Sequence, residues 1–322
     1  MGGVSSMRIA QVGPGIMPIP PNGWGAVEML IWDYYQILTQ QGHDVEIINT
    51  PHRTELLDEI WAGDFDAVHI HYDVFHDIFH QIDHPCLIVS SHYPFINTPP
   101  MWSRDNYHPV MRTFCENEKF NIFASSRKDI KTFTTCGADP NHVFMSRLGV
   151  RPEPYAFHHE PRYDKTLCFS QITDRKRQYL IQDHEDVDFM GRLELGQFRN
   201  QQNYFGEVPR EFLNHEITKY SNFTLLSSVE NTTPLVVKEA LICGLGVVVS
   251  ESVAVDLDDK PFIKVIPERL INNDKYIRNA LKDNREASRK YRKEIREYGI
   301  QKFGLANILA NEYIPLIEQL LE

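Results

Sequence analysis

Short apolar segments alternate with helical patterns along the whole chain. In the first half, each expected strand is apolar or β-branched at its centre. These strands are Arg8–Val12, Asp44–Asn49, Ala67–Tyr72, Cys86–Ser91, Asn121–Ser125 and His142–Arg147. The helix after the first strand is expected to begin near Gly25 and to end at Gln41-Gly42-His43. Strands that alternate with helices in this way predict a parallel sheet covered by helices on both faces.

A second series of the same kind follows Gly149–Pro154, where two prolines and a glycine interrupt helix and sheet. Its expected strands are Thr166–Ser170, Val187–Met190, Asn203–Gly206, Phe223–Ser227, Val247–Ser250 and Phe262–Ile266. Its expected helices are Arg175–Gln182, Arg210–Lys219, Thr233–Ile242 and everything after Glu268, with a strongly amphipathic last segment at Ala306–Leu321. The pattern predicts an α/β fold with two doubly wound parallel-sheet domains, residues 1–152 and 153–304.

Length and composition agree with two globular domains. The chain has 322 residues, of which 42% are apolar, enough for two buried cores. No apolar run approaches the roughly 20 residues that cross a bilayer, and Met1–Ser6 is too short and polar for a signal peptide. The five cysteines are scattered, without a C-x-x-C pair, and indicate neither a disulfide framework nor a zinc site. A cytoplasmic protein without a transmembrane segment is therefore expected.

The net charge of −11 disfavours a polyanionic partner, because nucleic-acid binding depends on Lys and Arg neutralising phosphates. The densest basic stretch, Arg289–Lys293, is flanked by glutamates and is typical of a solvated helix face. The charge distribution therefore disfavours nucleic acid as a partner.

Candidate chemistry concentrates between Ser228 and Gly244, where a strand ends and a Pro-containing turn opens a helix. In open α/β sheets such crevices bind ligands. Backbone N–H groups of the turn can hold phosphate oxygens, and Glu239 inside the helix can accept hydrogen bonds from ribose hydroxyls. This pattern suits a nucleotide sugar, with the phosphates at Thr232, Thr233, Pro234 and Leu235.

The same segment resembles the signature of family 4 glycosyltransferases, retaining enzymes of the GT-B class, in which two glutamates have seven residues between them. Here Glu230 and Glu239 have eight residues between them. Either a one-residue bulge returns Glu230 to its place, or Asn231 contacts the sugar through its amide. The chain is thus similar to a shortened and divergent member, with only about fifty residues between Lys176 and Glu230.

Two further segments carry the resemblance. The loop Pro20–Glu28, with Gly23, Trp24 and Gly25, is similar to the family's Gly-rich loop, where a missing Cβ lets the backbone approach a phosphate or sugar. A tight turn that only starts a helix is the alternative. Gln171, Arg175 and Lys176 occupy the place of an Arg and Lys pair that clamps the diphosphate. Lys176 matches the lysine, whereas Gln171 replaces the arginine, so one cation is lost or supplied by Arg175; a charged turn at the surface is the alternative.

The histidines divide into two groups. His92 follows the fourth strand, where family members place a histidine that faces donor and acceptor; a satisfied loop histidine is the alternative. His69 and His71 share one face of the third strand, and Asp73 is expected to add a third polar group there. His76, His80 and His84 are spaced for one face of a helix, which favours a polar helix face over a metal site, because no H-E-x-x-H is present.

The resemblance implies a GT-B fold, with two Rossmann-like domains facing across a cleft. The donor, a nucleoside diphosphate sugar, would bind residues 153–304, the acceptor would bind residues 1–152, and residues 305–322 would pack back on the first domain. The implied reaction is glycosyl transfer with retention of anomeric configuration, without cofactor or metal, to a saccharide, lipid-linked or small-molecule acceptor. Two alternatives remain: an inert nucleotide-sugar-binding protein and a hydrolytic, 2-epimerase-like enzyme. A dinucleotide-dependent oxidoreductase is disfavoured, since Gly13-Pro14-Gly15 lacks the third glycine of G-x-G-x-x-G.

Overall fold

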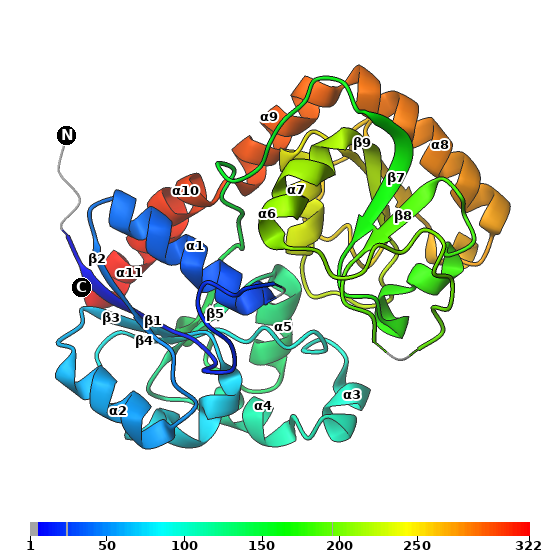
Figure 1. The fold of residues 1–322 in the computed structure, drawn as a ribbon. Coiled ribbons are helices and arrows are strands. Elements are labelled where there is room, and N and C mark those ends of the chain that lie inside the picture. Colours follow the sequence, from blue (N-terminus) through cyan, green and yellow to red (C-terminus); the bar gives the residue numbers. More distant parts are fainter. Residues whose placement is uncertain (1–5, 24, 195) are drawn as a thin grey trace. The chain divides into compact units, whose positions relative to one another are not determined.

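The computed structural model describes residues 6–23, 25–194 and 196–322. The chain divides into two compact units (Figure 1). Unit 1 contains the described residues up to Pro21, Gly25–Leu148 and the C-terminal segment Leu305–Glu322. Unit 2 contains Gly149–Gly304, together with Asn22 and Gly23. Each unit is built on one parallel sheet.

The sheet of unit 1 has six strands in the order β2-β1-β3-β4-β5-β6, all parallel. They are β1 (Arg8–Val12), β2 (Asp44–Ile48), β3 (Ala67–Ile70), β4 (Leu87–Val89), β5 (Asn121–Ala124) and β6 (Val143–Met145). Six strands were expected at these places from the sequence, and all six are confirmed. Because every strand is parallel, the carboxyl ends of all six lie at one edge of the sheet.

Alternate residues of each strand point to opposite faces, and each face has its own apolar core. On one face, Val12, Ile70 and Val89 pack with α2 (Arg53–Ala62), the 3₁₀-helix η1 (Asp73–Gln81), α4 (His108–Cys115) and α5 (Arg127–Thr135). On the other, Ile9, Ala67 and Ile88 pack with α1 (Ala26–Gln40) and the C-terminal helices. Short helices α3 (Pro99–Arg104) and η2 (Pro140–His142) lie in the connections.

The C-terminal segment packs on unit 1 as α10 (Leu305–Ile308), the π-helical turn η7 (Leu309–Tyr313) and α11 (Ile314–Leu321). Pro315 accounts for the π turn, because a proline inside a helix lacks an N–H and clashes with the carbonyl four residues earlier. Tyr313, at the end of this turn, is 1% exposed and lies in the core beside Tyr34 and Phe123.

The sheet of unit 2 has five parallel strands in the order β11-β10-β9-β7-β8. They are β7 (Tyr163–Phe169), β8 (Val187–Met190), β9 (Tyr220–Leu225), β10 (Gly246–Ser250) and β11 (Ile263–Ile266). Val247 and Val249 face a core that contains α7 (Leu235–Ile242) and α9 (Arg292–Phe303), whereas Val248 faces the core under α8 (Asp274–Lys290). The remaining helices are α6 (Arg210–Glu216) and the 3₁₀ turns η5 (Ile217–Lys219) and η6 (Glu268–Leu270).

Three expectations for unit 2 were wrong in detail. Asn203–Gly206 is not a strand: it runs beside β8 with one bridge, Phe189 to Tyr204. The expected helix Arg175–Gln182 is instead two 3₁₀ turns, η3 (Asp174–Lys176) and η4 (Gln178–Leu180), separated by Arg177 at φ 56°. Helix α7 begins at Leu235 and not at Thr233, because Pro234 is its N-cap in an extended conformation.

The two sheets, each with helices on both faces, confirm the predicted α/β fold with doubly wound parallel sheets. Within residues 6–23, 25–194 and 196–322, no helix combines the length and the apolar character that a membrane span requires.

Candidate functional site

Polar and charged side chains gather at the carboxyl ends of the strands in each unit, where open α/β sheets bind ligands. In unit 2 they come from the loops after β7, β9 and β10. In unit 1 they follow β1, β3, β4, β5 and β6. Each group is described within its own unit.

In unit 2, the turn that carries Arg175 and Lys176 is fixed to the loop after β9. Thr173 caps η3, with its hydroxyl accepting from the Lys176 N–H at 3.2 Å. The Arg175 carbonyl accepts from the Ser228 N–H at 2.8 Å and from the Ser228 hydroxyl at 3.0 Å. These bonds hold the two loops together without using the side chains of Arg175 and Lys176.

Arg175 and Glu230 form an ion pair. The Arg175 Nη1 donates to Glu230 Oε1 at 2.7 Å and to the Val229 carbonyl at 2.8 Å. The Ser227 hydroxyl donates to the same Glu230 oxygen at 2.6 Å. The Glu230 side chain is 12% exposed, so its negative charge is mostly shielded from solvent and is balanced by Arg175. The structure thus brings together two residues predicted to bind the donor, but they bind each other.

Lys176 is different from Arg175. It is half-buried, and burial lowers the pKa of its ammonium, while the nearby Glu230 carboxylate raises it. No group in the described part of the chain accepts a hydrogen bond from the Lys176 ammonium. A desolvated cation without a bonded partner is suited to an anionic ligand.

Glu239 lies in α7 with its side chain 7% exposed. Its Oε1 accepts from Arg210 Nη2, which also donates to the Tyr155 hydroxyl. Its Oε2 is buried, and no donor from the described residues reaches it. Burial raises the pKa of Tyr155 well above its usual value, and the adjacent Glu239 carboxylate raises it further. Glu239 therefore has one oxygen held in place and the other available to a hydroxyl donor.

The turn before α7 is held by Asp256. This carboxylate accepts from the Thr232 hydroxyl and, at 3.2 Å, from the Thr233 N–H. The first two amides of α7, those of Leu235 and Val236, have no acceptor among the described residues. The free N–H groups at this helix end thus lie two and three residues after Thr233, near which the sequence placed them.

The other predicted donor contacts fall in different surroundings. Gln171, in the loop after β7, donates through Nε2 to Glu194 Oε1. Asn231 is 9% exposed, next to Glu230. Gly25 is the N-cap of α1 with φ 149°, a conformation that favours glycine, and a Cβ there would meet Glu28 Oε2 at 3.1 Å. Gly23 is partly buried, and Trp24 lies outside the described residues.

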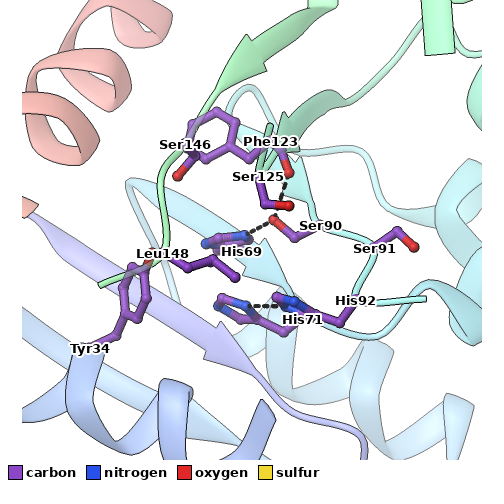
Figure 2. A pocket seen from close by; sticks show the side chains of 10 residues that line it. All are labelled: Tyr34, His69, His71, Ser90, Ser91, His92, Phe123, Ser125, Ser146 and Leu148. Carbon is purple, nitrogen blue, oxygen red and sulfur yellow. Dashed lines mark hydrogen bonds between the residues drawn. The ribbon is translucent and has the colours of Figure 1, made fainter. Parts of the chain in front are cut away.

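Unit 1 has a small polar pocket at the carboxyl edge of its sheet (Figure 2). Its cavity of about 10 Å³ has room for about one water molecule. It is lined by Tyr34, His69, His71, Ser90, Ser91, His92, Phe123, Ser125, Ser146 and Leu148. The predicted site residue His92 therefore shares a pocket with His69 and His71.

The three histidines are linked by hydrogen bonds. His71 Nδ1 lies 3.3 Å from His92 Nε2, and His71 Nε2 lies 2.7 Å from Gln11 Oε1. His69 Nε2 lies 2.9 Å from Ser90 Oγ, and its Nδ1 lies 3.0 Å from the Tyr313 hydroxyl. Figure 2 shows His92 directed toward His71. His92 is thus part of a buried network. Its bond to His71 fits a satisfied loop histidine as well as a binding role, so the role of His92 stays a prediction.

Burial keeps all three rings neutral. It lowers the pKa of His92 to about 4, and it lowers the pKa values of His69 and His71 well below the ordinary value. Charge repulsion between neighbouring histidines lowers the pKa values of His69 and His71 further. A neutral imidazole carries one donor and one acceptor nitrogen, so His92 can act on a substrate hydroxyl without adding charge.

Known proteins resemble this chain in structure, whereas no family model and no curated protein matches it in sequence. Sucrose-phosphate synthase from Thermosynechococcus elongatus has a TM-score of 0.76 at 13% identity, over 98% of this chain and 99% of that one. AviGT4, a glycosyltransferase involved in avilamycin A biosynthesis, has 0.69 at 15% identity, over 98% of both chains. Anabaena HepE, solved in complex with UDP-glucose, has 0.68 at 14% identity, over 97% of this chain and 99% of that one. The chain has the GT-B fold, and this predicted fold class is confirmed.

Several residues of the two sites were missed by sequence reasoning. They are Gln11 and Tyr313 in unit 1 and Arg210, Tyr155 and Asp256 in unit 2. Each lies far along the chain from its partner, as with Gln11 and Tyr313. A polar residue inside the apolar strand β1 was the one available signal for Gln11.

Two expectations about histidines and acids in unit 1 were wrong. Strand β3 ends at Ile70, so Asp73 begins η1 and accepts from Ser91 and Tyr107 instead of joining His69 and His71. His76, His80 and His84 do not share a helix face, because η1 is a 3₁₀-helix that ends at Gln81. Among the described residues, no cluster of three His, Cys, Asp or Glu has the geometry of a metal site.

Proposed function

We propose that this chain is a glycosyltransferase that takes a sugar from a nucleoside diphosphate sugar and passes it to an acceptor hydroxyl with retention of configuration. The GT-B fold supports this proposal, since AviGT4, which resembles this chain in structure, is a glycosyltransferase, and HepE, which also resembles it, was solved in complex with UDP-glucose. Family 4 is the relationship that the Glu230 and Glu239 segment favours, with this chain as a shortened and divergent member.

The observation that carries the proposal is the buried, unpartnered oxygen of Glu239 in a site that also contains an unbonded cation. Glu239 Oε2 has no hydrogen-bond donor among the described residues. The Lys176 ammonium, whose pKa burial lowers and the nearby Glu239 carboxylate raises, is suited to pair with an anion. A nucleoside diphosphate sugar supplies both, because its ribose carries hydroxyl donors and its diphosphate carries negative charge. The ligand would satisfy two unmet requirements of unit 2 at once.

The same groups suit the chemistry. Negative charge grows on the diphosphate as the glycosidic bond breaks, and fixed positive groups lower the energy of that state. Lys176 and the free N–H groups of Leu235 and Val236 are the groups that we assign to it. Because these are protein groups, we propose that transfer needs no metal, and full activity in excess EDTA is the expected result. Gly23, Trp24 and Gly25 stay predictions as phosphate or sugar contacts.

We propose that unit 1 binds the acceptor through His92. A neutral His92 can orient an acceptor or sugar hydroxyl by hydrogen bonding. The departing diphosphate would then accept the proton of the acceptor hydroxyl. Either Glu230 or Asn231 would contact the sugar. A saccharide, a lipid-linked sugar or a small molecule is the proposed acceptor class.

A thermal-shift panel of UDP-, GDP-, ADP- and TDP-sugars tests the proposal, because a ligand that binds the folded state raises its melting temperature by mass action. At least one nucleotide sugar is expected to stabilise the wild type, and the Lys176→Met variant should lose most of that shift. The anomeric configuration of the product, read by NMR, tests retention. No stabilisation by any member of the panel would contradict nucleotide-sugar binding.

One observation favours a second candidate, an inert or hydrolytic GT-B protein that binds a nucleotide sugar without transferring it. Arg175 is paired with Glu230 and Gln171 is bonded to Glu194, so neither presents a second cation to the diphosphate. If a nucleotide sugar that raises the melting temperature is split to free sugar, without transfer to any hydroxyl acceptor, the hydrolytic form is favoured. Binding without release would favour the inert one.

A further inference from the structure

A continuous line of hydrogen bonds crosses the interior of unit 1. It begins at the backbone carbonyl of Phe123 in β5 and ends at the His92 ring after β4. The intervening groups, in order, are Ser90, His69, Tyr313, Gln11 and His71. Every bond in this line measures between 2.7 and 3.3 Å. Since the groups come from four strand ends and the C-terminal segment, the line exists only in the folded unit.

The direction of the line is set at its first member. A carbonyl can only accept, so the Ser90 hydroxyl donates its one proton to Phe123 O at 3.1 Å. The bond between Ser90 Oγ and His69 Nε2 must then have the histidine as donor. His69 is neutral, and with its proton on Nε2 its Nδ1 is an acceptor. The Tyr313 hydroxyl therefore donates to His69 Nδ1.

The same logic fixes the remaining members. Tyr313 donates its only hydroxyl proton to His69, so its oxygen accepts from the Gln11 Nε2 at 2.9 Å. This turns the Gln11 Oε1 toward His71, where it can only accept, and His71 must carry its proton on Nε2. Neutral His71 then accepts at Nδ1, and His92 is the donor through Nε2. One backbone carbonyl thus dictates the tautomer of all three histidines.

From this line we propose that Gln11 and Tyr313 are positioning residues that hold His92 as its Nε2–H tautomer, so that the His92 Nδ1 lone pair accepts a hydrogen bond from a substrate hydroxyl. The identity of that hydroxyl, on the acceptor or on the transferred sugar, rests on the proposed function. The tautomer itself does not depend on it. No residue of the described chain donates to His92 Nδ1, which leaves this atom to the substrate.

The C-terminal segment gains a specific role from this proposal. Tyr313 ends the π turn η7, two residues before Pro315. Its ring packs against Tyr34, at 5.1 Å between centroids, and against Phe123. The π turn and these rings hold the hydroxyl between Gln11 and His69. The last helices would then orient a site group as well as complete the core.

Nitrogen NMR of histidine tautomers tests the proposal without any substrate. In protein carrying ¹⁵N-labelled histidine, His69, His71 and His92 are each expected to show a protonated Nε2 and an unprotonated Nδ1 at pH 7. Single His→Gln variants assign the three signals. A protonated Nδ1 on His92 in the wild type would overturn the proposal.

The Tyr313→Phe variant tests the positioning role. It keeps the ring and removes the hydroxyl that joins Gln11 to His69, so the His92 signal should shift toward a mixture of tautomers. With a donor that stabilises the wild type, kcat is expected to fall about tenfold while the donor Kd stays within twofold, consistent with about 1.4 kcal/mol of lost orientation. Gln11→Met should have the same two effects.

Tyr220→Phe is the matched control, because this buried tyrosine in unit 2 bonds Asp188 at 2.9 Å outside the line. It should change neither the tautomers nor kcat. An unaltered His92 tautomer in folded Tyr313→Phe would overturn the positioning role. If the tautomers are as expected and no donor is ever turned over, the proposed function fails and the tautomer assignment stands.

Discussion

Arg210 pairs with the buried Glu239 in unit 2, and this ion pair uses one carboxylate oxygen of Glu239 and leaves the other without a donor among the described residues. A buried acceptor without a partner is unfavourable, so a site that keeps one has a use for it. The pair holds Glu239 rigidly, and a ligand hydroxyl that reaches Oε2 gains a hydrogen bond to a charged group.

Glu239→Ala should weaken binding of the nucleotide sugar. Loss of a hydrogen bond to a charged acceptor costs about 1.5–3 kcal/mol, or roughly a tenfold to hundredfold rise in Kd. Isothermal titration with the donor identified by thermal shift measures this change. Glu216→Gln is the matched control, since Glu216 is equally buried and paired with Lys219. Equal affinity in Glu239→Ala and the wild type would remove the ribose contact.

Lys176→Met should lower affinity for both the nucleotide sugar and the free nucleoside diphosphate. Methionine keeps the apolar stem and removes the charge, so the change reports the cation alone. We expect about a tenfold loss, because a charge-assisted bond in a desolvated site is stronger than one at the surface. Lys282→Met, on the exposed face of α8, is the control and should bind as the wild type does.

Glu230→Gln should destabilise unit 2 without weakening diphosphate binding. The substitution leaves Arg175 without its negative partner in a mostly buried pair, which costs on the order of 1–3 kcal/mol. Arg175, released from Glu230, should then bind a nucleoside diphosphate as tightly as the wild type or more so. Chemical denaturation measures the first effect and calorimetry the second. A large loss of nucleoside diphosphate affinity would show that Glu230 itself organises the phosphate site.

His92→Ala should reduce turnover and leave donor affinity largely unchanged. Positioned hydrogen bonding by a histidine contributes up to about a hundredfold in rate, and unit 2 carries the donor contacts. Steady-state kinetics at saturating donor measure the effect. Turnover equal to that of the wild type would return His92 to a structural role in its buried network.

Folding stability should fall as the pH drops from 7 to 5. The pKa of His92 is about 4 in the folded state, whereas an unfolded histidine titrates near 6.5. The unfolded chain therefore binds more protons in this window, and stability is full above about pH 6.5 and declines below it. His92 alone contributes a loss on the order of 1–2 kcal/mol at pH 5, and His69 and His71 act in the same direction.

Thermal unfolding across this pH range checks the expectation. A His92→Gln variant should lose less stability between pH 7 and 5 than the wild type does, because it removes one of the groups that titrate. A melting temperature independent of pH in this window would mean that the three rings are not held neutral.

The pattern of apolar and polar residues determined the architecture. Parallel strands covered on both faces are mostly apolar runs, and this signal is strongest where every residue of the strand is buried, as in β3, β5 and β10. The same logic placed Lys176 in the turn after β7 and Glu239 in the helix after β9, since the order of strand, loop and helix is local information. Elements without a buried face were less predictable. The turn at Arg175–Gln182 is two 3₁₀ segments around a left-handed residue, which charge and propensity alone did not indicate.

Side-chain partners were decided by tertiary structure. The sequence could not show that Glu230 pairs with Arg175, or that Arg210 donates to one oxygen of Glu239. The partners in these two pairs are 55 and 29 residues apart in the chain. Gln11 and Tyr313 are 302 residues apart, yet their hydrogen bond joins His69 to His71 in the line that reaches His92. Hydrogen bonding depends on distance and angle between atoms, and only the packed sheets and the returning C-terminal segment bring those atoms within range. The sequence thus named the groups capable of chemistry, and the fold decided which of them remain available to a ligand.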